Sequence, residues 1–407
     1  MKCRHCGASL HRSFLDLGSA PPSNAYLTAT ALNAPEVWYP LRLLVCEQCW
    51  LVQTEDHAGR EALFSADYAY FSSFSSSWLH HAQTYVQTMQ QRYGLGPQSC
   101  VAEVAANDGY LLQYVQQAGI PCYGIEPTAS TAAAARAKGL EIVERFFGTE
   151  LAQTLVAQGR QADLMAANNV LAHVPDINDF VAGFAILLKP SGVATFEFPH
   201  LLSMVRECQF DTAYHEHYSY LSLGSVQRIF AANGLQVIDV EPLPTHGGSL
   251  RVHAQRQGGG RIPSSAVAAW LATEHSAGMA DVGFYTHFQS QALRIKHQLL
   301  SFLLQAQKDG RKVGAYGAAA KGNTLLNFAG VRPDLLPYVA DLNPAKQGKF
   351  MPGSRIPIVS PSELRAHRPD YLLILPWNIA EEIQQQNADL KQAGTRFCVV
   401  VPELRFL

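Results

Sequence analysis

The sequence lacks any long hydrophobic run and any block of charge of one sign. No segment approaches the roughly 20 apolar residues that a membrane-spanning helix needs, and the N-terminal "MKCRHCGASL" has no apolar core of the kind a signal peptide requires. Lys and Arg number 31 against 33 Asp and Glu, for a formal net charge of −2. These absences argue against a membrane protein, a secreted protein and an electrostatic nucleic-acid binder, and we expect a cytoplasmic chain.

Charged residues are scarce overall, at 16% of the chain, whereas hydrophobic residues make up 48%. This balance argues against intrinsic disorder and provides ample apolar surface to bury. A length of 407 residues exceeds one ordinary core, so we expect two or three domains. We predict a small N-terminal lobe over residues 1–70, a central domain over 71–258 and a C-terminal domain over 259–407.

Four of the eight cysteines form two C-x-x-C pairs, Cys3 with Cys6 and Cys46 with Cys49. In a reducing compartment such thiols favour metal ligands or redox pairs over disulfides. Two pairs complete the tetrahedral sulfur shell that zinc prefers, and an all-cysteine shell leaves no open coordination position. We therefore predict a structural zinc ion, with redox pairs or unrelated thiols as the alternative.

The remaining sequence alternates between helical and extended patterns. The stretch "WLHHAQTYVQTMQQRYGLG" has helical periodicity and should end at Gly94 or Gly96, and "SCVAEVAANDGYLLQYVQQAGIPCYGIEP" is typical of strand, turn, helix and strand. Further buried strands in "ADLMAANNV" and "GVATFEFP" predict a doubly wound parallel sheet in the central domain. Because "RKVGAYGAAAKGNTLLN" repeats the pattern, the C-terminal domain is expected to be a smaller Rossmann-like α/β domain.

The first turn of the central domain lacks the glycines of a dinucleotide site. Ala105 and Asn107 stand at two positions of G-x-G-x-x-G and only Gly109 is glycine, which argues against NAD and FAD. S-adenosylmethionine carries no phosphates and tolerates small residues there. Glu103, near the end of the first strand, could hold its amino-acid end, and Glu126, after the next strand, could hold its ribose. An ordinary tight turn with two surface acids is the alternative.

Two polar segments follow at positions where a ligand is expected. Asn168 ends a predicted strand on the rim above the cofactor, and His173 after it is either functional or structural. The segment "DTAYHEHYSYLSL" at 211–223 crowds histidines and tyrosines around one glutamate. Three interpretations of this segment are open: a metal site, an acid/base site and an amphipathic strand.

Taken together, these motifs resemble the class I S-adenosylmethionine-dependent C-methyltransferases that act on nucleotide-linked keto-deoxysugars. The resemblance spans essentially the whole chain and rests on the cysteine knuckles with "PPSNAYL", then "EVAANDGYLL", "ANNVLAHV", "YHEHYSYLSL", "HGGSLRV" and "GAYGAAAKGNTLLN" in this order. It implies methylation at sugar position three beside a ketone at position four, in branched deoxysugar biosynthesis. The implied partner is a dTDP- or GDP-linked sugar, with no nucleic-acid or membrane partner, and we expect a monomer or weak dimer.

The resemblance also implies a catalytic set with His217 as the base. Carbon must lose a proton before it can attack, so such a site needs a base, a carboxylate to orient it and donors for the enolate oxygen. In an extended segment Glu216 and His217 would point to opposite faces, so we predict irregular backbone, with Glu216 paired to either His217 or His173. The implied catalytic residues are Tyr214, Glu216, His217, His173 and a tyrosine of "DYAYFSS", Tyr70 in preference to Tyr68.

Two motifs are candidates for binding the sugar nucleotide. The glycines of "THGGSLRV" would let backbone approach the substrate while His246 or Arg251 faces a phosphate, although a plain β-turn is equally consistent. In "YGAAAKGNT", Lys321 and Asn323 could meet a diphosphate at a helix N-terminus, and the alternative is a turn that only packs. An O- or N-methyltransferase would need the cofactor site but no carbon base. A zinc-knuckle interaction or nucleic-acid module is a further alternative, and the absence of basic residues clustered around the knuckles argues against it.

Overall fold

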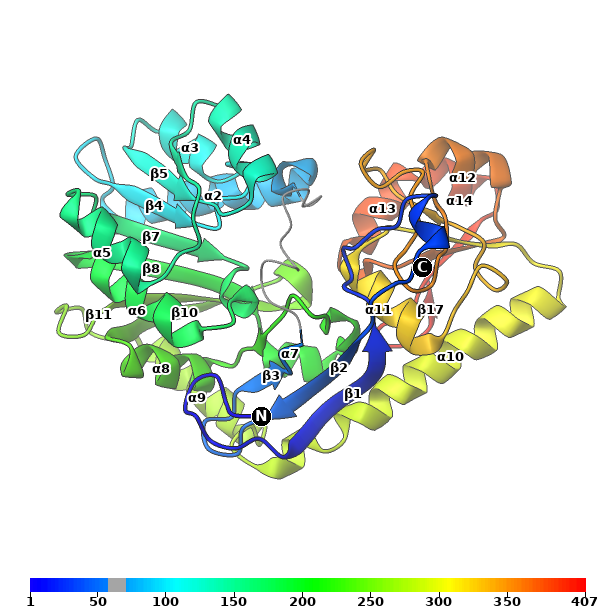
Figure 1. Cartoon of the computed structure of the whole chain (residues 1–407), viewed down its shortest axis with the longest axis horizontal. Coiled ribbons are helices and arrows are strands. Elements are labelled where there is room, and N and C mark those ends of the chain that lie inside the picture. Colours follow the sequence, from blue (N-terminus) through cyan, green and yellow to red (C-terminus); the bar gives the residue numbers. More distant parts are fainter. Residues whose placement is uncertain (58–70) are drawn as a thin grey trace.

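The chain folds around three β-sheets. A computed structural model describes residues 1–57 and 71–407, so the predicted pocket tyrosines Tyr68 and Tyr70 lie outside the described residues. The sheets have four, seven and six strands and belong to the N-terminal lobe, the central domain and the C-terminal domain. Figure 1 shows the central and C-terminal domains as two bodies, with the lobe and a long helix beneath them. No described helix is both long and apolar enough to cross a membrane.

The sheet of the N-terminal lobe is antiparallel and takes its last strand from far along the chain. Its strand order is β1-β2-β3-β9. Strand β9 comes directly after the histidine-rich segment and pairs with β3, with Val52 opposite Tyr220 and Gln53 opposite Ser219. The lobe is therefore joined to the central domain by backbone pairing. The strands are β1 (Arg12–Ala20), β2 (Tyr39–Val45), β3 (Val52–Thr54) and β9 (Ser219–Tyr220).

The central sheet has a parallel half and an antiparallel edge, in the order β10-β11-β8-β7-β4-β5-β6. Strands β4 to β8 pair in parallel, whereas β11 pairs antiparallel with both β8 and β10. This confirms the doubly wound sheet predicted from the sequence. The strands are β4 (Val101–Val104), β5 (Cys122–Ile125), β6 (Ile142–Val143), β7 (Ala162–Asn168), β8 (Leu188–Pro199), β10 (Leu235–Leu243) and β11 (Ser249–Arg256).

Helices cover both faces of the central sheet (Figure 1). Helix α2 ends where its sequence predicts, because Gly94 follows it with φ +64°, a left-handed conformation that glycine adopts without strain. Helix α9 follows the sheet in sequence and packs on β10 and α8. The helices are α2 (Ser76–Tyr93), α3 (Leu112–Gln117), α4 (Ala129–Ala137), α5 (Thr149–Ala157), α6 (Ile177–Leu187), α7 (Leu201–Arg206), α8 (Leu223–Ala232) and α9 (Ser265–Ser276).

The C-terminal domain is a second, smaller α/β unit, as the repeated strand and helix pattern predicts. Its strand order is β14-β13-β12-β15-β16-β17, and only the β16–β17 pair is antiparallel among the described pairs. The strands are β12 (Val313–Tyr316), β13 (Val339–Ala340), β14 (Ile358–Val359), β15 (Tyr371–Ile374), β16 (Arg396–Val399) and β17 (Arg405–Phe406). The helices are α10 (Phe288–Lys308), α11 (Ala320–Ala329), α12 (Pro361–His367), α13 (Ala380–Gln386) and α14 (Ala388–Gln392).

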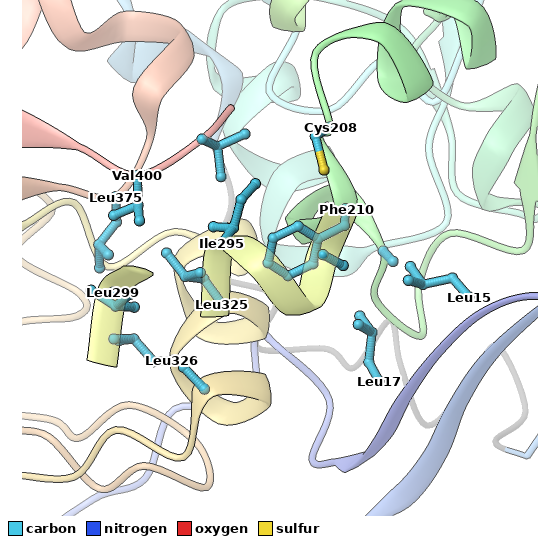
Figure 2. Packing of buried hydrophobic residues seen from close by; sticks show 14 of the residues in the cluster. Leu15, Leu17, Cys208, Phe210, Ile295, Leu299, Leu325, Leu326, Leu375 and Val400 are labelled. Atoms are coloured by element: carbon cyan, nitrogen blue, oxygen red, sulfur yellow. The ribbon is translucent and has the colours of Figure 1, made fainter. Parts of the chain in front are cut away.

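One hydrophobic core ties the three parts together. It combines apolar side chains of β1, of the segment after α7, of α10 and α11, and of the ends of β15 and β16. Burying apolar surface of this kind contributes roughly 25 cal/mol for each Å² removed from water, so the three parts are held as one body by a common core. Figure 2 shows this packing, with Leu15, Leu17, Cys208, Phe210, Ile295, Leu299, Leu325, Leu326, Leu375 and Val400.

Candidate active site

The four paired cysteines converge on one point in the N-terminal lobe. All four sulfur atoms lie within 4.8 Å of one another, and the Sγ atoms of Cys3 and Cys49, and of Cys6 and Cys46, are 3.5 Å apart. A tetrahedral shell with Zn–S bonds of about 2.3 Å places its sulfurs about 3.8 Å apart, so this set fits zinc. Because all four positions are filled by cysteine, such an ion is structural and takes no part in chemistry.

The turn between β4 and α3 has an unusual backbone. Ala105, Asn107 and Gly109 have φ values of +59°, +49° and +76°. A Cβ atom on Gly109 would lie 2.2 Å from a methyl carbon of Leu140, so this side chain would have to move, and the left-handed backbone also favours glycine there. Left-handed conformations at non-glycine residues are strained and concentrate at functional sites. The turn is therefore shaped for more than a change of chain direction.

Two buried carboxylates flank this turn. Glu126 accepts hydrogen bonds from the backbone amides of Asn107 and Thr128, both at 2.9 Å, which fixes its carboxylate at the end of β5. Glu103 is fully buried in β4, and neither of its oxygens makes a well-formed hydrogen bond within the described part of the chain. Burial raises the pKa of Glu103 well above its usual value, and the Tyr110 hydroxyl opposes this in part.

The two carboxylates show whether the residues of this turn suit S-adenosylmethionine. A buried carboxylate without a full set of donors is stabilised by a cationic ligand, and this cofactor carries an ammonium group and a sulfonium group. Asn168, at the end of β7, is also buried, and its Oδ1 lacks a partner among the described residues. Glu103, Glu126 and Asn168 thus form a set that suits the amino-acid end and ribose of the cofactor.

The segment "AYHEHY" is irregular backbone, as its sequence predicts. Residues 213–218 lie between a 3-10 helix, Phe210–Thr212, and strand β9. We call residues 213–218 the histidine loop. A turn closes it through a hydrogen bond from the His217 amide to the Tyr214 carbonyl at 2.9 Å. This turn removes the strand geometry that would place Glu216 and His217 on opposite faces.

The histidine loop brings together two histidines from distant parts of the sequence. The ring of His217 lies edge-on to that of His173, with centroids 4.6 Å apart, and the Tyr214 ring lies 3.9 Å from that of His217. The Nδ1 of His217 donates to the Thr212 carbonyl at 2.8 Å. Since that nitrogen holds the proton, Nε2 is the basic atom of His217.

Glu216 reaches toward the N-terminal lobe. Its Oε1 accepts a hydrogen bond from Nδ2 of Asn24 at 2.7 Å. His173, in contrast, interacts with the backbone of Glu216. Asn24 belongs to "PPSNAYL", a motif that carries the family resemblance, but its contact with Glu216 could not be derived from the sequence because 192 residues separate the two.

The neighbouring His215 does not share this pocket arrangement. Its Nε2 lies 3.2 Å from the Pro40 carbonyl, and its ring packs at 5.9 Å from that of Tyr39. Among the described residues, the histidines of the loop join no cluster of three or more potential metal ligands. The metal interpretation of this segment therefore finds no support in the described structure.

Burial keeps the pocket histidines uncharged near neutral pH. It lowers the pKa of His173 to about 4 and that of His246 to about 4. Burial lowers the pKa of His217 well below its usual value, and the neighbouring His173 adds to the effect. Each imidazole is therefore in its neutral form at physiological pH, with one ring nitrogen unprotonated.

The C-terminal domain contributes a partly buried cation. Lys321, in the first turn of α11, donates to Oδ1 of Asn378 at 2.6 Å and lies 4.3 Å from the centre of the Trp377 ring. Burial lowers the pKa of Lys321 to about 8, partly opposed by Asp211, whose own pKa burial raises to about 6. Asp211 accepts from Nε1 of Trp377 at 2.8 Å, which links the start of the histidine loop to this domain.

Asn323, two residues further along α11, is fully buried. Neither its Nδ2 nor its Oδ1 has a hydrogen-bond partner among the described residues. Its neighbour Thr324 donates from its hydroxyl to the Ala213 carbonyl at 2.8 Å, so this turn of α11 lies against the histidine loop. An unsatisfied buried amide is costly unless a ligand completes it, which supports Asn323 as a binding residue.

The "THGGSLRV" motif places its two predicted residues differently. His246, with φ +55°, lies 3.2 Å from Nδ2 of Asn169 through its Nε2 and packs at 5.4 Å from Trp78. Arg251 is buried in β11 and pairs with Glu197 at 3.0 Å and with Glu241 at 3.5 Å. Arg251 is thus already neutralised within the protein.

Gly247 of the same motif marks the contact between the domains. A Cβ atom on Gly247 would lie 2.5 Å from the Trp377 ring, so glycine lets the two domains approach. Trp377 and Asp211 were not singled out in the sequence. No local pattern distinguishes either residue, because each acquires its role from the other domain.

Comparison with known proteins agrees with this geometry. Family models match residues 3–64 as a zinc binding domain, 78–240 as a methyltransferase domain and 244–402 as a C-methyltransferase C-terminal domain. The chain is 35% identical to the C-methyltransferase NovU of Streptomyces niveus over 409 aligned residues, covering 100% of this chain and 96% of that protein. A ubiquinone biosynthesis O-methyltransferase of Bordetella avium is 31% identical over 98 residues, which cover 24% of this chain and 41% of that protein.

Among solved structures, the magnesium protoporphyrin IX methyltransferase of Synechocystis with bound SAH matches 44% of this chain and 83% of its own. Its sequence identity is 16% and its TM-score 0.36.

Proposed function

This chain belongs to the S-adenosylmethionine-dependent C-methyltransferases with an N-terminal zinc-binding domain, and we propose that it methylates position three of a nucleoside-diphosphate 4-keto-deoxysugar. The proposed route passes through an enolate, and its product would enter branched deoxysugar biosynthesis. The observation that carries the proposal is the contact between the partly buried rings of His217, on the histidine loop, and His173, with Lys321 close enough to act electrostatically on His217.

The first chemical requirement is a base that is neutral before it acts. When bound, S-adenosylmethionine supplies an electrophilic methyl group, which oxygen and nitrogen nucleophiles can attack with little more than alignment. A sugar carbon must lose a proton first. His217 suits this task because burial keeps it uncharged and its Nδ1 contact with Thr212 leaves Nε2 to take the proton.

The second requirement is stabilisation of negative charge on the enolate oxygen. Lys321 is cationic below its pKa of about 8, and its charge lies close enough to lower the pKa of His217 and of His246. The Tyr214 hydroxyl and the side chains of His246 and Asn323 are further donors in the proposed substrate set. In a water-poor pocket such groups stabilise developing charge more strongly than solvent does.

The proposed sugar nucleotide is linked to dTDP or GDP and binds against the C-terminal domain. Lys321 and Asn323 in the first half of α11 are the proposed contacts for it. His246 is the better of the two proposed phosphate contacts in "THGGSLRV", because the charge of Arg251 is already paired with Glu197 and Glu241. Glu103, Ala105, Asn107, Gly109, Glu126 and Asn168 form the proposed cofactor site.

The second candidate is an O- or N-methyltransferase on a sugar or another small molecule. The partial match to an O-methyltransferase over 98 residues is the observation that keeps it in view. That activity needs the same cofactor site but gives no reason to bring two neutral histidines together beside a tyrosine. The geometry therefore favours carbon.

The deciding experiment measures methyl transfer from labelled cofactor to a panel of nucleotide 4-keto-6-deoxy and 2,6-dideoxy sugars. The expected product carries the label on carbon three by NMR, and tritium placed at that carbon is released to solvent during turnover. Sugars whose position four is a hydroxyl serve as controls and should remain unmethylated. A label found on oxygen or nitrogen, without tritium release, would replace the proposal by the second candidate.

A further inference from the structure

Residues of strand β3 connect the cysteine site to the histidine loop. Gln53 is fully buried, accepts a hydrogen bond from the Arg4 amide at 2.9 Å, and donates from Nε2 to the Cys3 sulfur at 3.2 Å. The backbone of the same residue pairs with Ser219 in β9, two residues after His217. One residue of β3 thus contacts a metal ligand through its side chain and pairs through its backbone with β9, the strand that follows the loop.

Thr54, the next residue, holds the loop itself. Its hydroxyl donates to the His217 carbonyl at 2.6 Å, and its amide donates to the Tyr218 carbonyl at 3.1 Å. Thr54 is 1% exposed, so these contacts are made away from competing water. They fix the backbone of the residue that carries the base.

Arg4 forms a second connection from inside the first cysteine pair. Its guanidinium donates to the Thr54 carbonyl at 2.9 Å and to the Pro175 carbonyl at 2.8 Å, and it lies 5.2 Å from the centre of the Tyr218 ring. Pro175 comes two residues after His173. The side chain is 5% exposed, and a buried arginine fork held by several acceptors is rigid.

We propose that the zinc knuckle positions the catalytic histidines, with Thr54 as a positioning residue for His217 and Arg4 as a positioning residue for both His217 and His173. This inference rests on the proposed function of the two histidines. It gives the cysteine site a role beyond stabilising the lobe, because the ligand loop is joined to the reacting groups by buried hydrogen bonds. A misplacement of about 1 Å at such a group can lower the rate about 100-fold.

The principal test compares Thr54→Val, which removes the hydroxyl at nearly constant volume, with Thr54→Ser, which keeps it. We expect Thr54→Val to lower kcat about 10- to 100-fold while the KM of the sugar and the Kd of S-adenosylmethionine stay unchanged. Thr54→Ser should recover most of the rate. Thr28→Val is the matched control, since Thr28 is an exposed threonine of the same lobe.

Arg4→Met tests the second connection, with Arg12→Met as its control because Arg12 is a more exposed arginine of the lobe. All four cysteines remain, so zinc measured by elemental analysis should stay at one equivalent in each variant. The expected result is a lower kcat with full zinc content. An unchanged kcat in both Thr54→Val and Arg4→Met would overturn the proposal. It would also be overturned if Thr54→Val and Thr54→Ser lost zinc content or folded protein to the same extent.

A readout without turnover separates this inference from the proposed function. In protein labelled with 13C-histidine, the His217 resonance, assigned with His217→Gln, should titrate with a low pKa in the wild type. Thr54→Val should move that pKa toward the ordinary histidine value, because a loosened loop admits water. A wild-type enzyme that methylates no sugar of the panel would reject the proposed function alone, whereas an unmoved His217 pKa would count against Thr54.

Discussion

Both α/β domains contain a strand–helix–strand unit with an acidic residue directly after its second strand. In each domain this acid accepts a hydrogen bond from a backbone amide in the turn after the first strand. In the central domain, Glu126 after β5 accepts the amide of Asn107, in the turn that leads to α3, at 2.9 Å. In the C-terminal domain, Asp341 after β13 accepts the amide of Ala318, in the turn that leads to α11, at 2.7 Å. Each acid also accepts the amide two residues after itself.

The two domains differ in the charged residues that surround this acid and its turn. Strand β4 carries the buried acid Glu103 and helix α3 has no charged residue, whereas strand β12 has no acid and helix α11 carries Lys321. Asp341 is also offset by Lys346 at 3.7 Å. On the proposed function, the shared fold sets the position of a ligand, and one or two side chains select its charge, a cationic cofactor for the central domain and an anionic sugar nucleotide for the C-terminal domain.

The largest effect is expected at the loop between the two domains, in His217→Gln. Both domains should still bind their ligands, while turnover falls about 100- to 10,000-fold because no group removes the carbon proton. Rapid-quench turnover and calorimetric titration with cofactor provide the measurements. His275→Gln, at an exposed position on α9, is the control. Near-normal turnover in His217→Gln would remove this residue from the mechanism.

Glu103→Gln tests whether the central domain is built for a cation. We expect the Kd of S-adenosylmethionine to rise about 10- to 100-fold, since a hydrogen bond to a charged group is worth about 1.5–3 kcal/mol, while the KM of the sugar is unaffected. Because burial raises the pKa of Glu103, its charged form costs folding free energy at neutral pH. The cofactor-free variant should therefore melt at a higher temperature than the wild type.

Glu150→Gln, with a side chain 86% exposed, is the matched control for the central domain and should change neither quantity. A cofactor Kd that is equal in Glu103→Gln and wild type would contradict the assignment of charge to this domain.

For the C-terminal domain, the corresponding prediction is that the use of the sugar nucleotide depends on pH through the charge of Lys321. Its pKa is lowered to about 8, so the amine is charged below that pH and loses its charge above it. We expect kcat/KM for the sugar nucleotide to fall about tenfold per pH unit above pH 8, while cofactor affinity stays level. Lys321→Arg should move this fall to higher pH, because arginine stays protonated. A flat profile to pH 9 in the wild type would contradict a role for the charge.

Much of this comparison was visible in the sequence. The C-x-x-C pairs predicted the cysteine site, because four thiols in two pairs have few other uses in a reducing compartment. The strand, turn and helix around Gly109 and the repeat of that pattern near Lys321 predicted both α/β domains. The irregular histidine loop followed from one physical argument, that a strand would separate Glu216 from His217.

The partners of these residues could not be predicted, because they come from other sheets. Asn24 lies 192 residues before Glu216, and Thr54 lies 163 residues before His217. The pairing of β9 with β3 brings Thr54 to His217, and a two-residue strand leaves almost no pattern in the sequence. The burial that lowers the pKa of Lys321 is likewise a property of the packed domains.

The smallest effects are expected from changing the two matched acids, Glu126→Gln and Asp341→Asn. Each carboxylate accepts two backbone amides, one on each oxygen, whereas the amide side chain that replaces it has a single oxygen. Each variant therefore loses the negative charge and one of the two turn hydrogen bonds. We expect a change of about two- to tenfold in the affinity of one ligand, in line with about 1 kcal/mol for a neutral hydrogen bond. Glu126→Gln should weaken the cofactor and Asp341→Asn the sugar nucleotide, as measured by calorimetry. If each domain binds its own ligand, each variant should change the affinity of that ligand alone. A weaker cofactor in Asp341→Asn, or a weaker sugar nucleotide in Glu126→Gln, would contradict this separation.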